Sequence, residues 1–424
     1  MKPATLRQAQ ISLLWLAFNA QWLTILPILI PDQVSAILGA SAANREGVTG
    51  TIAALGAFVA LLVAPLAGAL SDRSGGARGR RRLFLIVGIA GSCVALALLI
   101  PFGAGNSIAL YGLAILHLQF WWNWAAGPYA GLVPDVMPPS EQAGASAWLN
   151  VMSVAGAIIG NALIFASYAQ GRPAKALGGL IVITLACLWF TLRVAEPPAI
   201  QDPQPFQLGA FLRSFLLKPG DHPNFYWVLV TRLVSNLGVW SVFTFLLFYL
   251  QDVIGVEHPE QVLPVLLGAG AILAVPASFL GVRWSEKYGV VRTVQATSWI
   301  MAAAVSGYVL VALHPDIRLA APLILIYAAA YGAYQSADWA LALRVLPARA
   351  SAGKDMGIWH ISMVLPQIVG PASIGWIISG VRHAVTAPVA YTVAFGIAAF
   401  WFVLSALLVG RVRLAPEAAP GRPA

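Results

Sequence analysis

Long apolar runs separated by short polar stretches divide the whole chain into regular segments. An α-helix rises about 1.5 Å per residue, so about 20 apolar residues cross the roughly 30 Å core of a bilayer. Twelve runs reach this length, and each predicts a transmembrane helix. Their approximate ranges are 11–30, 48–70, 83–102, 107–133, 145–168, 176–195, 225–250, 262–283, 293–313, 319–345, 356–380 and 386–410. The pattern therefore predicts an all-α membrane protein with twelve transmembrane helices.

Composition supports a membrane setting and excludes a nucleic-acid partner. The chain is 59% hydrophobic and 10% charged, far from the usual balance of soluble domains. Its net charge of +9 would suit a polyanion only if a soluble domain carried a basic face, and no long soluble stretch exists. We expect the lipid bilayer to be its surroundings, with a small-molecule solute as its partner and a monomer as its state.

The distribution of Lys and Arg predicts the orientation. With the N-terminus in the cytoplasm, the termini and loops on that side hold 19 of these residues, the outer loops hold 5, and Arg232 lies within a span. Positive charge is retained on the cytoplasmic side during insertion, so both termini are expected there, in a cytoplasmic (inner) membrane. The five outer residues are Arg45, Arg172, Lys175, Arg318 and Arg382.

Two short stretches recur at similar offsets and predict an internal duplication. "SDRSGGAR" from residue 71 is echoed by "SEKYGVVR" from residue 285, and "VMPPSEQAG" from residue 136 by "VLPARASAG" from residue 345. Such repeats are common among transporters. We therefore predict two six-helix halves, 1–195 and 225–424, joined by a proline-rich cytoplasmic linker with a short amphipathic helix over 196–224.

The first loop carries a family resemblance. "GALSDRSG" over 68–75 is similar to the G-x-L-x-D-R-x-G signature of the major facilitator superfamily, and the predicted topology extends the resemblance over the whole chain. The longer "DRSGGARGRRR" and "GPYAGLVPD" over 127–135 resemble the sucrose-carrier-like branch of sugar:proton symporters. The resemblance implies two pseudo-symmetric six-helix bundles, the major facilitator fold, and transport by alternating access.

The resemblance also implies a latch that holds the outward-facing state. Asp72 would accept hydrogen bonds from free N–H groups where the span 356–380 begins, and Asp135 would pair with a loop arginine such as Arg73 or Arg80. The simpler alternative is a charge cluster that only sets topology. The residues expected in the latch are Gly68, Asp72, Arg73, Gly75, Arg80, Asp135, Glu286, Lys287 and Asp355.

Two charges at membrane depth are the first candidates for solute binding. Arg232 and Asp338 each lie about seven residues, or roughly 10 Å, into their spans, so an ion pair is geometrically possible. Such a pair either stays closed as a structural element or opens as solute or proton enters. Asp338 and His117 are the candidate groups for proton coupling.

Polar side chains on shared helix faces extend this candidate site. Tyr331, Gln335 and Asp338 share one face of the span 319–345, a pattern that suits hydroxyl binding over an aromatic floor but also ordinary packing. Gln119 and Asn123 share a face of 107–133, opposite His117. Further candidates are Asn19, Gln21 and Asn236, whose amides could line a cavity or bridge helices.

Enzyme chemistry has little support in the sequence. There is no phosphate-binding loop, metal-ligand cluster or loop large enough for a catalytic domain, so we expect no enzyme activity and no cofactor, with H⁺ as the coupling ion. The leading hypothesis is proton-coupled uptake of a sugar or similar hydroxylated solute. The alternative is proton-antiport efflux of an amphipathic drug-like compound or metabolite, with Trp122, Trp240 and Trp339 as cavity walls.

Overall fold

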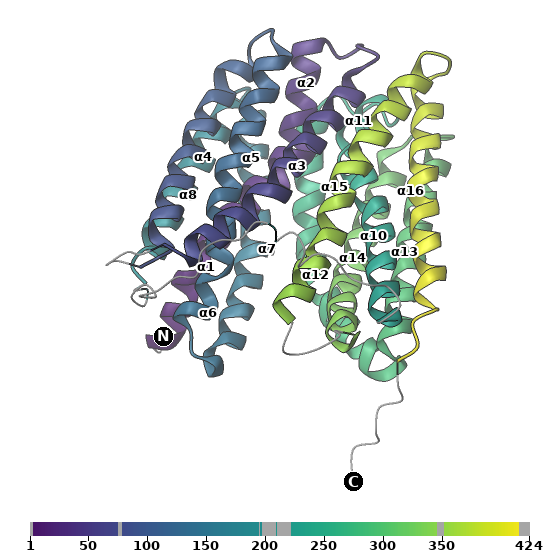
Figure 1. Ribbon diagram of the computed structural model, residues 1–424. Coiled ribbons are helices and arrows are strands. Elements are labelled where there is room, and N and C mark those ends of the chain that lie inside the picture. The colour runs from purple at the N-terminus through teal and green to yellow at the C-terminus, as the bar shows by residue number, and fades with distance from the viewer. Residues whose placement is uncertain are drawn as a thin grey trace.

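The protein is a bundle of long helices (Figure 1). The computed structural model describes residues 3–74, 79–194, 196, 209, 222–345 and 352–414, with the side chains at 3, 4, 139, 140, 142, 143 and 352–360 excepted. No strand occurs within these ranges. The first group of helices is α1 (Pro3–Thr24), η1 (Ile25–Leu29, a π-helical turn), α2 (Ile30–Leu38), α3 (Arg45–Asp72), α4 (Arg82–Gly103), α5 (Ile108–Ala130), α6 (Leu132–Val136), α7 (Pro139–Ala169) and α8 (Ala174–Thr191).

The second group begins after the predicted linker, most of which lies outside the described residues. Its helices are α10 (Pro223–Phe243), α11 (Leu246–Asp252), α12 (Pro259–Tyr288), α13 (Val290–Val311), α14 (Ile317–Val345), α15 (Ala352–Arg382) and α16 (Ala387–Val409). We call the end where α1 begins and α16 ends the proximal end, and the opposite end the distal end.

Each predicted span coincides with a helix, or with consecutive helices that continue one another. Within the described ranges, ten helical segments are long and apolar enough to cross a membrane, and α10 with α11, bent by 42°, makes an eleventh if the pair counts as one span. The predicted span 107–133 corresponds to α5, whose 23 residues include His117, Gln119 and Asn123. Apolarity therefore supports eleven of the twelve spans, and α5 is long enough but less apolar.

The two groups of helices pack mainly within themselves. In the first group α1 packs against α7, and α5 against both α3 and α4; in the second, α12 packs against α14, and α13 against α14 and α16. The largest contacts between the groups are α3 with α15 and α7 with α12, and smaller ones join α11 to α2 and η1, and α12 to η1. The domain boundaries at 195 and 225 stay a prediction, but this packing is the arrangement that they would produce.

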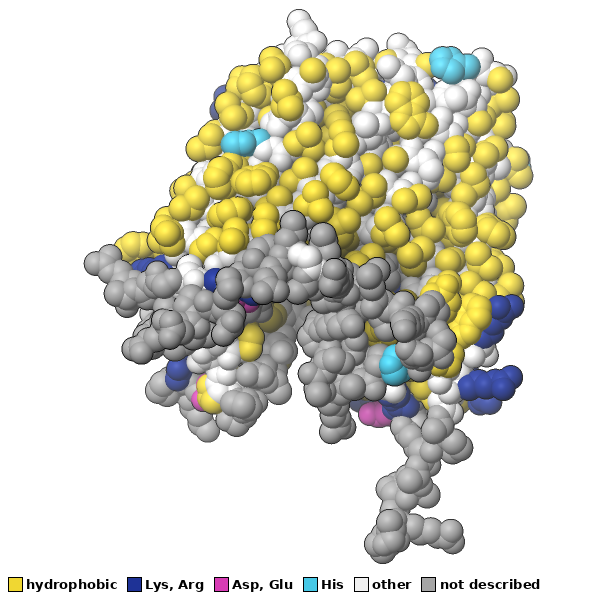
Figure 2. Space-filling model, in the orientation of Figure 1, with side chains coloured by type: hydrophobic (Ala, Val, Ile, Leu, Met, Phe, Trp, Pro, Cys, Tyr) yellow, Lys and Arg dark blue, Asp and Glu magenta, His cyan; other side chains and the backbone are white. Residues whose placement is uncertain are grey.

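Large apolar side chains form the outer surface of the bundle. Phe279 is 68% exposed and Leu313 is 71% exposed, and hydrophobic side chains cover most of the visible face (Figure 2). Lysine and arginine side chains gather near the proximal end on this face. A surface of this kind is stable against lipid and unstable in water, which agrees with an integral membrane protein.

Small residues allow the helices to approach closely. A Cβ atom on Gly127 of α5 would overlap the carbonyl oxygen of Ala64 in α3, and one on Gly332 of α14 would overlap the backbone of α12 at Ala274. Helices in a bilayer associate through packing, because lipid tails give apolar side chains no reason to leave them. Glycines at these crossings therefore help to hold each group of helices together.

We predict that Gly127→Ala destabilises the first group of helices. The added methyl has to push α3 and α5 apart, and overpacking of this kind costs about 1–3 kcal/mol. The melting temperature of the purified protein in detergent, followed by tryptophan fluorescence, should fall by several degrees. Gly178→Ala in α8 is the matched control, because a Cβ there meets nothing within 4 Å. Equal melting temperatures for the two variants would contradict the prediction.

Candidate functional site

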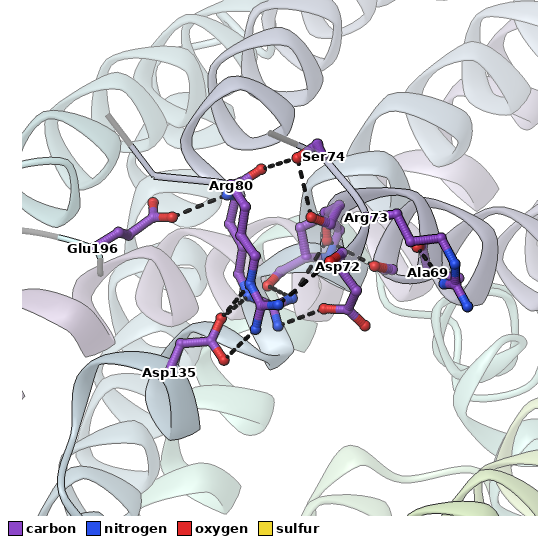
Figure 3. A network of polar contacts seen from close by, with 11 residues as sticks. Ala69, Asp72, Arg73, Ser74, Arg80, Asp135 and Glu196 are labelled. Carbon is purple, nitrogen blue, oxygen red and sulfur yellow. Dashed lines mark hydrogen bonds and ion pairs between the residues drawn. The ribbon is translucent and has the colours of Figure 1, made fainter. Parts of the chain in front are cut away.

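An ion-pair network closes the proximal end of the first group (Figure 3). Arg81 donates from Nε to Asp135 at 2.6 Å and from an Nη atom to Asp72 at 2.7 Å. Arg80 binds the same Asp135 carboxylate at 2.7 Å and 3.1 Å. The backbone N–H of Arg81 donates to Glu196 at 2.9 Å. The network thus ties the loop between α3 and α4 to α6 and to the segment after α8.

Arg81 is the centre of this network, although it is not among the predicted latch residues. Its side chain is 6% exposed, and its other Nη atom reaches the Pro128 carbonyl oxygen at 3.1 Å and Ser71 Oγ at 3.4 Å. Burial acts to raise the pKa of Asp135, but the hydrogen bonds from Arg81 and Arg80 outweigh it and hold that pKa below its usual value. Burial raises the pKa of Glu196.

Some predicted latch residues form the expected contact, and others do not. Arg80 pairs with Asp135 as expected, whereas Arg73 donates to the Ala69 carbonyl oxygen of its own helix at 2.7 Å. Gly68 lies beside Gly127, where α3 crosses α5. Glu286 and Lys287 are exposed at the end of α12, and Lys287 Nζ lies 5.0 Å from the centre of the Tyr288 ring.

Two latch residues remain. Gly75 lies outside the described residues, and the side chain of Asp355 also lies outside them. The expected contact between Asp72 and the start of α15 belongs to the outward-facing state. It stays a prediction.

A second charged network lies at the distal end and connects the two groups of helices. Arg45 at the start of α3 pairs with Asp252 at the end of α11, and Arg382 at the end of α15 pairs with Glu46. Arg45 also reaches Glu46 at 3.2 Å, and Arg382 reaches Asp252 at 3.1 Å. The Tyr391 hydroxyl of α16 donates to either carboxylate, at 3.1 Å and 3.3 Å. We call these five residues the distal network.

The distal network was not predicted. In the sequence, Arg45 and Arg382 indicate only topology, yet in the structure Arg45 and Glu46 have no exposed side-chain surface. Two guanidinium groups and two carboxylates balance one another, which offsets the cost of burying them. One sequence feature could have predicted this network: all four charges lie at the ends of predicted spans, on one side of the membrane.

Other contacts close the distal end around this network. The Gly47 N–H donates to Ser379 Oγ at 2.9 Å, and Trp376 Nε1 donates to Thr51 Oγ1 at 3.0 Å. A Cβ on Gly50 would overlap the Pro371 carbonyl oxygen. All of these contacts join α3 to α15 in their distal halves. The structure therefore shows the two groups of helices closed against each other at the distal end.

The predicted intramembrane ion pair is present between α10 and α14. Arg232 and Asp338 bind each other, with side chains that are 7% and 2% exposed. The Tyr334 hydroxyl lies 3.5 Å from Asp338, and an Nη atom of Arg232 lies 4.0 Å from Met363 Sδ in α15. Asn236 donates to the Arg232 carbonyl oxygen one turn below. Whether the pair opens during function remains a prediction.

Tyrosines extend from this pair along α14. Tyr331 stacks between Tyr327 and Tyr334, with ring centres 6.3 Å and 6.4 Å apart, and Gln335 is half-buried on the same helix. Tyr327, Tyr331 and Tyr334 thus form a row of aromatic rings that ends at the charge of Asp338. The same stacking also packs α14, so both expectations for Tyr331 remain open.

A pocket lies between the last turn of α1 and the middle of α5. Its walls are the amides of Gln21 and Gln119, the indole rings of Trp22 and Trp122, and aliphatic side chains from η1, α2 and α5. Gln21 is 1% exposed and donates from Nε2 to Thr184 Oγ1 at 2.6 Å. Its Oε1 atom has no hydrogen-bond donor within the described part of the chain. One of the two amides that line the pocket therefore has an unused acceptor.

The other predicted residues of this half, Asn19, His117 and Asn123, are not among the residues that line the pocket. Asn123 donates to the carbonyl oxygen of Gln119 at 2.8 Å and to its Oε1 at 3.3 Å, so these two side chains share a face as expected. Asn19 bonds to the Trp15 carbonyl oxygen and to Ser153 in α7, which makes it a bridge between helices. His117 contacts the Trp121 ring, away from Gln119.

The tryptophans named for the efflux alternative are placed differently from one another. Trp122 lines the pocket and packs on Phe18, and Trp240 is 6% exposed and contacts Trp22 at 6.0 Å between ring centres. Trp339 is 49% exposed. The pocket is thus next to α10 through Trp22 and Trp240.

Within the described residues no group of three or more His, Cys, Asp or Glu could hold a metal ion.

Comparison with known proteins identifies the family. Residues 11–353 match the Major Facilitator Superfamily. The chain belongs to this superfamily. No curated protein gives a significant match to this facilitator.

Solved structures share its fold at low identity. A bacterial homologue of the human lysosomal transporter Spinster, inward-facing and unoccupied, is 17% identical with a TM-score of 0.65, and the match covers 98% of this chain and 100% of that one. The nucleoside transporter NupG is 12% identical with a TM-score of 0.71, over 97% of this chain and 99% of that one.

One protein among these matches has been solved in two states. A bacterial homologue of the iron transporter ferroportin gives a TM-score of 0.71 in its inward-facing state, at 14% identity over 96% of this chain and 98% of that one. Its outward-facing state gives 0.61, at 13% identity over 97% and 99%. The higher score belongs to the inward-facing state.

We predict that Arg81→Lys loosens the proximal network. A lysine cannot bind Asp72 and Asp135 at once with a planar fork, and losing a buried charge-assisted hydrogen bond costs about 1–3 kcal/mol. Hydrogen–deuterium exchange should become faster over residues 79–82 and 132–136. Arg73→Lys is the control, since Arg73 bonds within its own helix. Unchanged exchange in Arg81→Lys would show that Arg80 alone holds Asp135.

We predict that Glu46→Gln opens the distal end. The change leaves Arg45 and Arg382 with one carboxylate, and breaking a buried ion pair costs about 3–5 kcal/mol. Spin labels on Gln170→Cys and His314→Cys, exposed near the distal ends of the two groups, report the opening as longer distances when Cys93 and Cys187 are replaced by serine. Glu257→Gln, on an exposed residue outside the network, should keep the short distances. Short distances in Glu46→Gln would mean that packing alone closes this end.

Proposed function

We propose that this facilitator is a secondary active transporter that works by alternating access, with proton-coupled uptake of a sugar or similar hydroxylated solute. Family and fold support secondary transport. The pocket and the Arg232–Asp338 pair supply groups that could bind a solute near the middle of the bundle. The closed distal end supplies one of the two states that alternating access requires.

The distribution of charge supports an orientation with both termini in the cytoplasm. Of the five residues counted as outer, Arg45 and Arg382 are held in the distal network, which leaves Arg172, Lys175 and Arg318 exposed at the distal end. The positive-inside rule depends on the count of Lys and Arg in the loops, which stays 19 against 5. In a cytoplasmic (inner) membrane the distal end would face outward, and the structure would be inward-facing. The site lies within one chain, which is compatible with a monomer.

The single observation that carries the substrate class is the Gln21 Oε1 atom. A buried acceptor without a donor costs free energy, and a solute hydroxyl that donates to it removes this cost. Trp22 and Trp122, which also line the pocket, offer flat apolar surfaces of the kind that pack against the C–H faces of a sugar ring. Gln119 on the facing helix supplies a second amide, and Asn123 holds it in place. We therefore favour a neutral solute with several hydroxyl groups.

The coupling group in this proposal is Asp338. A proton on Asp338 would release Arg232, so protonation and opening of the pair are linked. The row of tyrosines beside it keeps the pair out of bulk water. H⁺ is the proposed coupling ion, and no cofactor is required.

Efflux of an amphipathic compound is the second candidate. Six of the eight residues that line the pocket are apolar, Trp22 and Trp122 among them, which suits a flat apolar molecule. The resemblance of the first loop to the sucrose-carrier-like branch supports uptake instead. The two candidates differ in which way protons move when solute is added.

Reconstitution into liposomes with an internal pH dye and a fixed membrane potential tests the proposal. A panel of mono- and disaccharides is added outside, and we expect internal acidification with at least one sugar. We predict that Asp338→Asn abolishes it, whereas Glu257→Gln, an exposed acid at the distal end, keeps it. Proton movement with cationic amphiphiles and with none of the sugars would favour efflux.

A double variant separates the two roles of the ion pair. Asp338→Asn leaves Arg232 as a buried charge without its partner, so loss of transport in the single variant has a structural explanation as well. Arg232→Gln with Asp338→Asn removes both charges. Restored sugar-dependent acidification in the double variant would make the pair structural and would exclude Asp338 as the coupling group.

A further inference from the structure

A second acid lies within the helical bundle near the distal end, without a cation. Asp32 is in the first turn of α2, and its Oδ2 accepts a hydrogen bond from the Tyr168 hydroxyl of α7 at 2.6 Å. Among the described residues no lysine or arginine forms an ion pair with it. It differs in this respect from Asp338, Glu46 and Asp252, each of which binds a guanidinium group.

The groups that surround Asp32 come from several helices, and none of them neutralises it. Tyr111 of α5 is fully buried, interacts electrostatically with Asp32, and has a hydroxyl without a hydrogen-bond partner in the described residues. Glu260 of α12, from the other group of helices, also interacts electrostatically with Asp32. Glu260 itself is bonded to His258 at 3.2 Å, and its side chain is 15% exposed.

The remaining neighbours of α2 offer no free charge. On α3 and α11 the nearest charged residues by position, Arg45, Glu46 and Asp252, belong to the distal network. On the α4 side, Gly103 packs against the amide of Gln33. Asp32 therefore has two tyrosine hydroxyls and a second carboxylate around it.

Closing the distal end has a specific consequence for this carboxylate. α12 of one group packs against α7 and η1 of the other. In the closed state Glu260 of α12 lies near enough to interact electrostatically with Asp32, which is itself partly buried. Two carboxylates in a low dielectric repel, and each loses hydration. A proton on one of them removes both costs. Tyr168 and Tyr111 can then act as hydrogen-bond partners of a neutral carboxyl group.

We propose that Asp32 is a proton-binding site that is filled when the distal end closes. Because the closed state brings Asp32 near a second carboxylate, it binds protons more tightly than the open state. Acid on the distal side therefore favours closure, and alkali favours opening. The inference rests on the alternating access of the proposed function, and it is independent of which solute is carried. It adds a proton site to the transporter that is separate from the Arg232–Asp338 pair.

The test follows closure directly and needs no solute. The full-length protein carries spin labels at Gln170→Cys and His314→Cys in the background without Cys93 and Cys187, and distances are measured in liposomes from about pH 8 to about pH 5. The ratio of short to long distances should rise about tenfold as the pH falls, a typical coupling between two sites. Asp32→Asn, which is neutral at every pH, should keep the short distances throughout.

Two further variants make the result specific. Tyr168→Phe removes a donor that stabilises the ionised carboxylate, so the midpoint of closure should move to higher pH. Asp316→Asn, at an exposed acid in the loop before α14, should leave the pH response unchanged. A pH response of normal size in Asp32→Asn, or long distances at every pH in that variant, would overturn the proposal. If no sugar caused acidification in the transport assay, the pH dependence of closure would still test the role of Asp32.

Discussion

The cost of placing charge in a low dielectric explains most of the polar architecture of this protein. Each buried carboxylate of the two networks lies against a guanidinium group, and each network lies where helices end and backbone groups also need partners. The consequence is mechanical. At the proximal end the charges join segments of one group of helices, whereas at the distal end they join the two groups. Only the distal set has to break when the groups separate there.

This difference assigns separate tasks to the two ends. Arg81 binds α6, the end of α3 and the end of α5 to one loop, so the proximal network makes the first group behave as one body. Between the ends, the pocket and the Arg232–Asp338 pair belong to different groups and meet through Trp22 and Trp240. A solute between them would contact both bodies, and that is how binding can be coupled to their relative movement.

The helices were predictable, and most of the contacts between them were not. Apolar runs of about 20 residues report where a chain crosses a bilayer, because each span has to satisfy its own backbone. α5 is instructive, because it was recognised by length although Gln119, Asn123 and its tryptophans make it less apolar than its neighbours. The Arg232–Asp338 pair was predictable because charges at that depth are rare and few partners exist.

The distal network was not predictable, since Arg45 and Asp252 are 207 positions apart and helix ends commonly carry charge. Arg81 was missed because five arginines in one loop are equivalent until packing distinguishes them.

The π-helical turn at Ile25–Leu29 sets the phase of the chain that follows it. In an unbroken α-helix Asp32, eleven positions after Gln21, would return to nearly the same azimuth, because each residue advances by about 100°. A wide turn accommodates roughly one extra residue, so α2 is rotated backwards by about a quarter of a revolution relative to α1. Gln21 consequently points to Thr184 in α8, while Asp32 points to Tyr168 in α7. One irregular turn thus lets a single membrane crossing present its amide and its carboxylate to different neighbours.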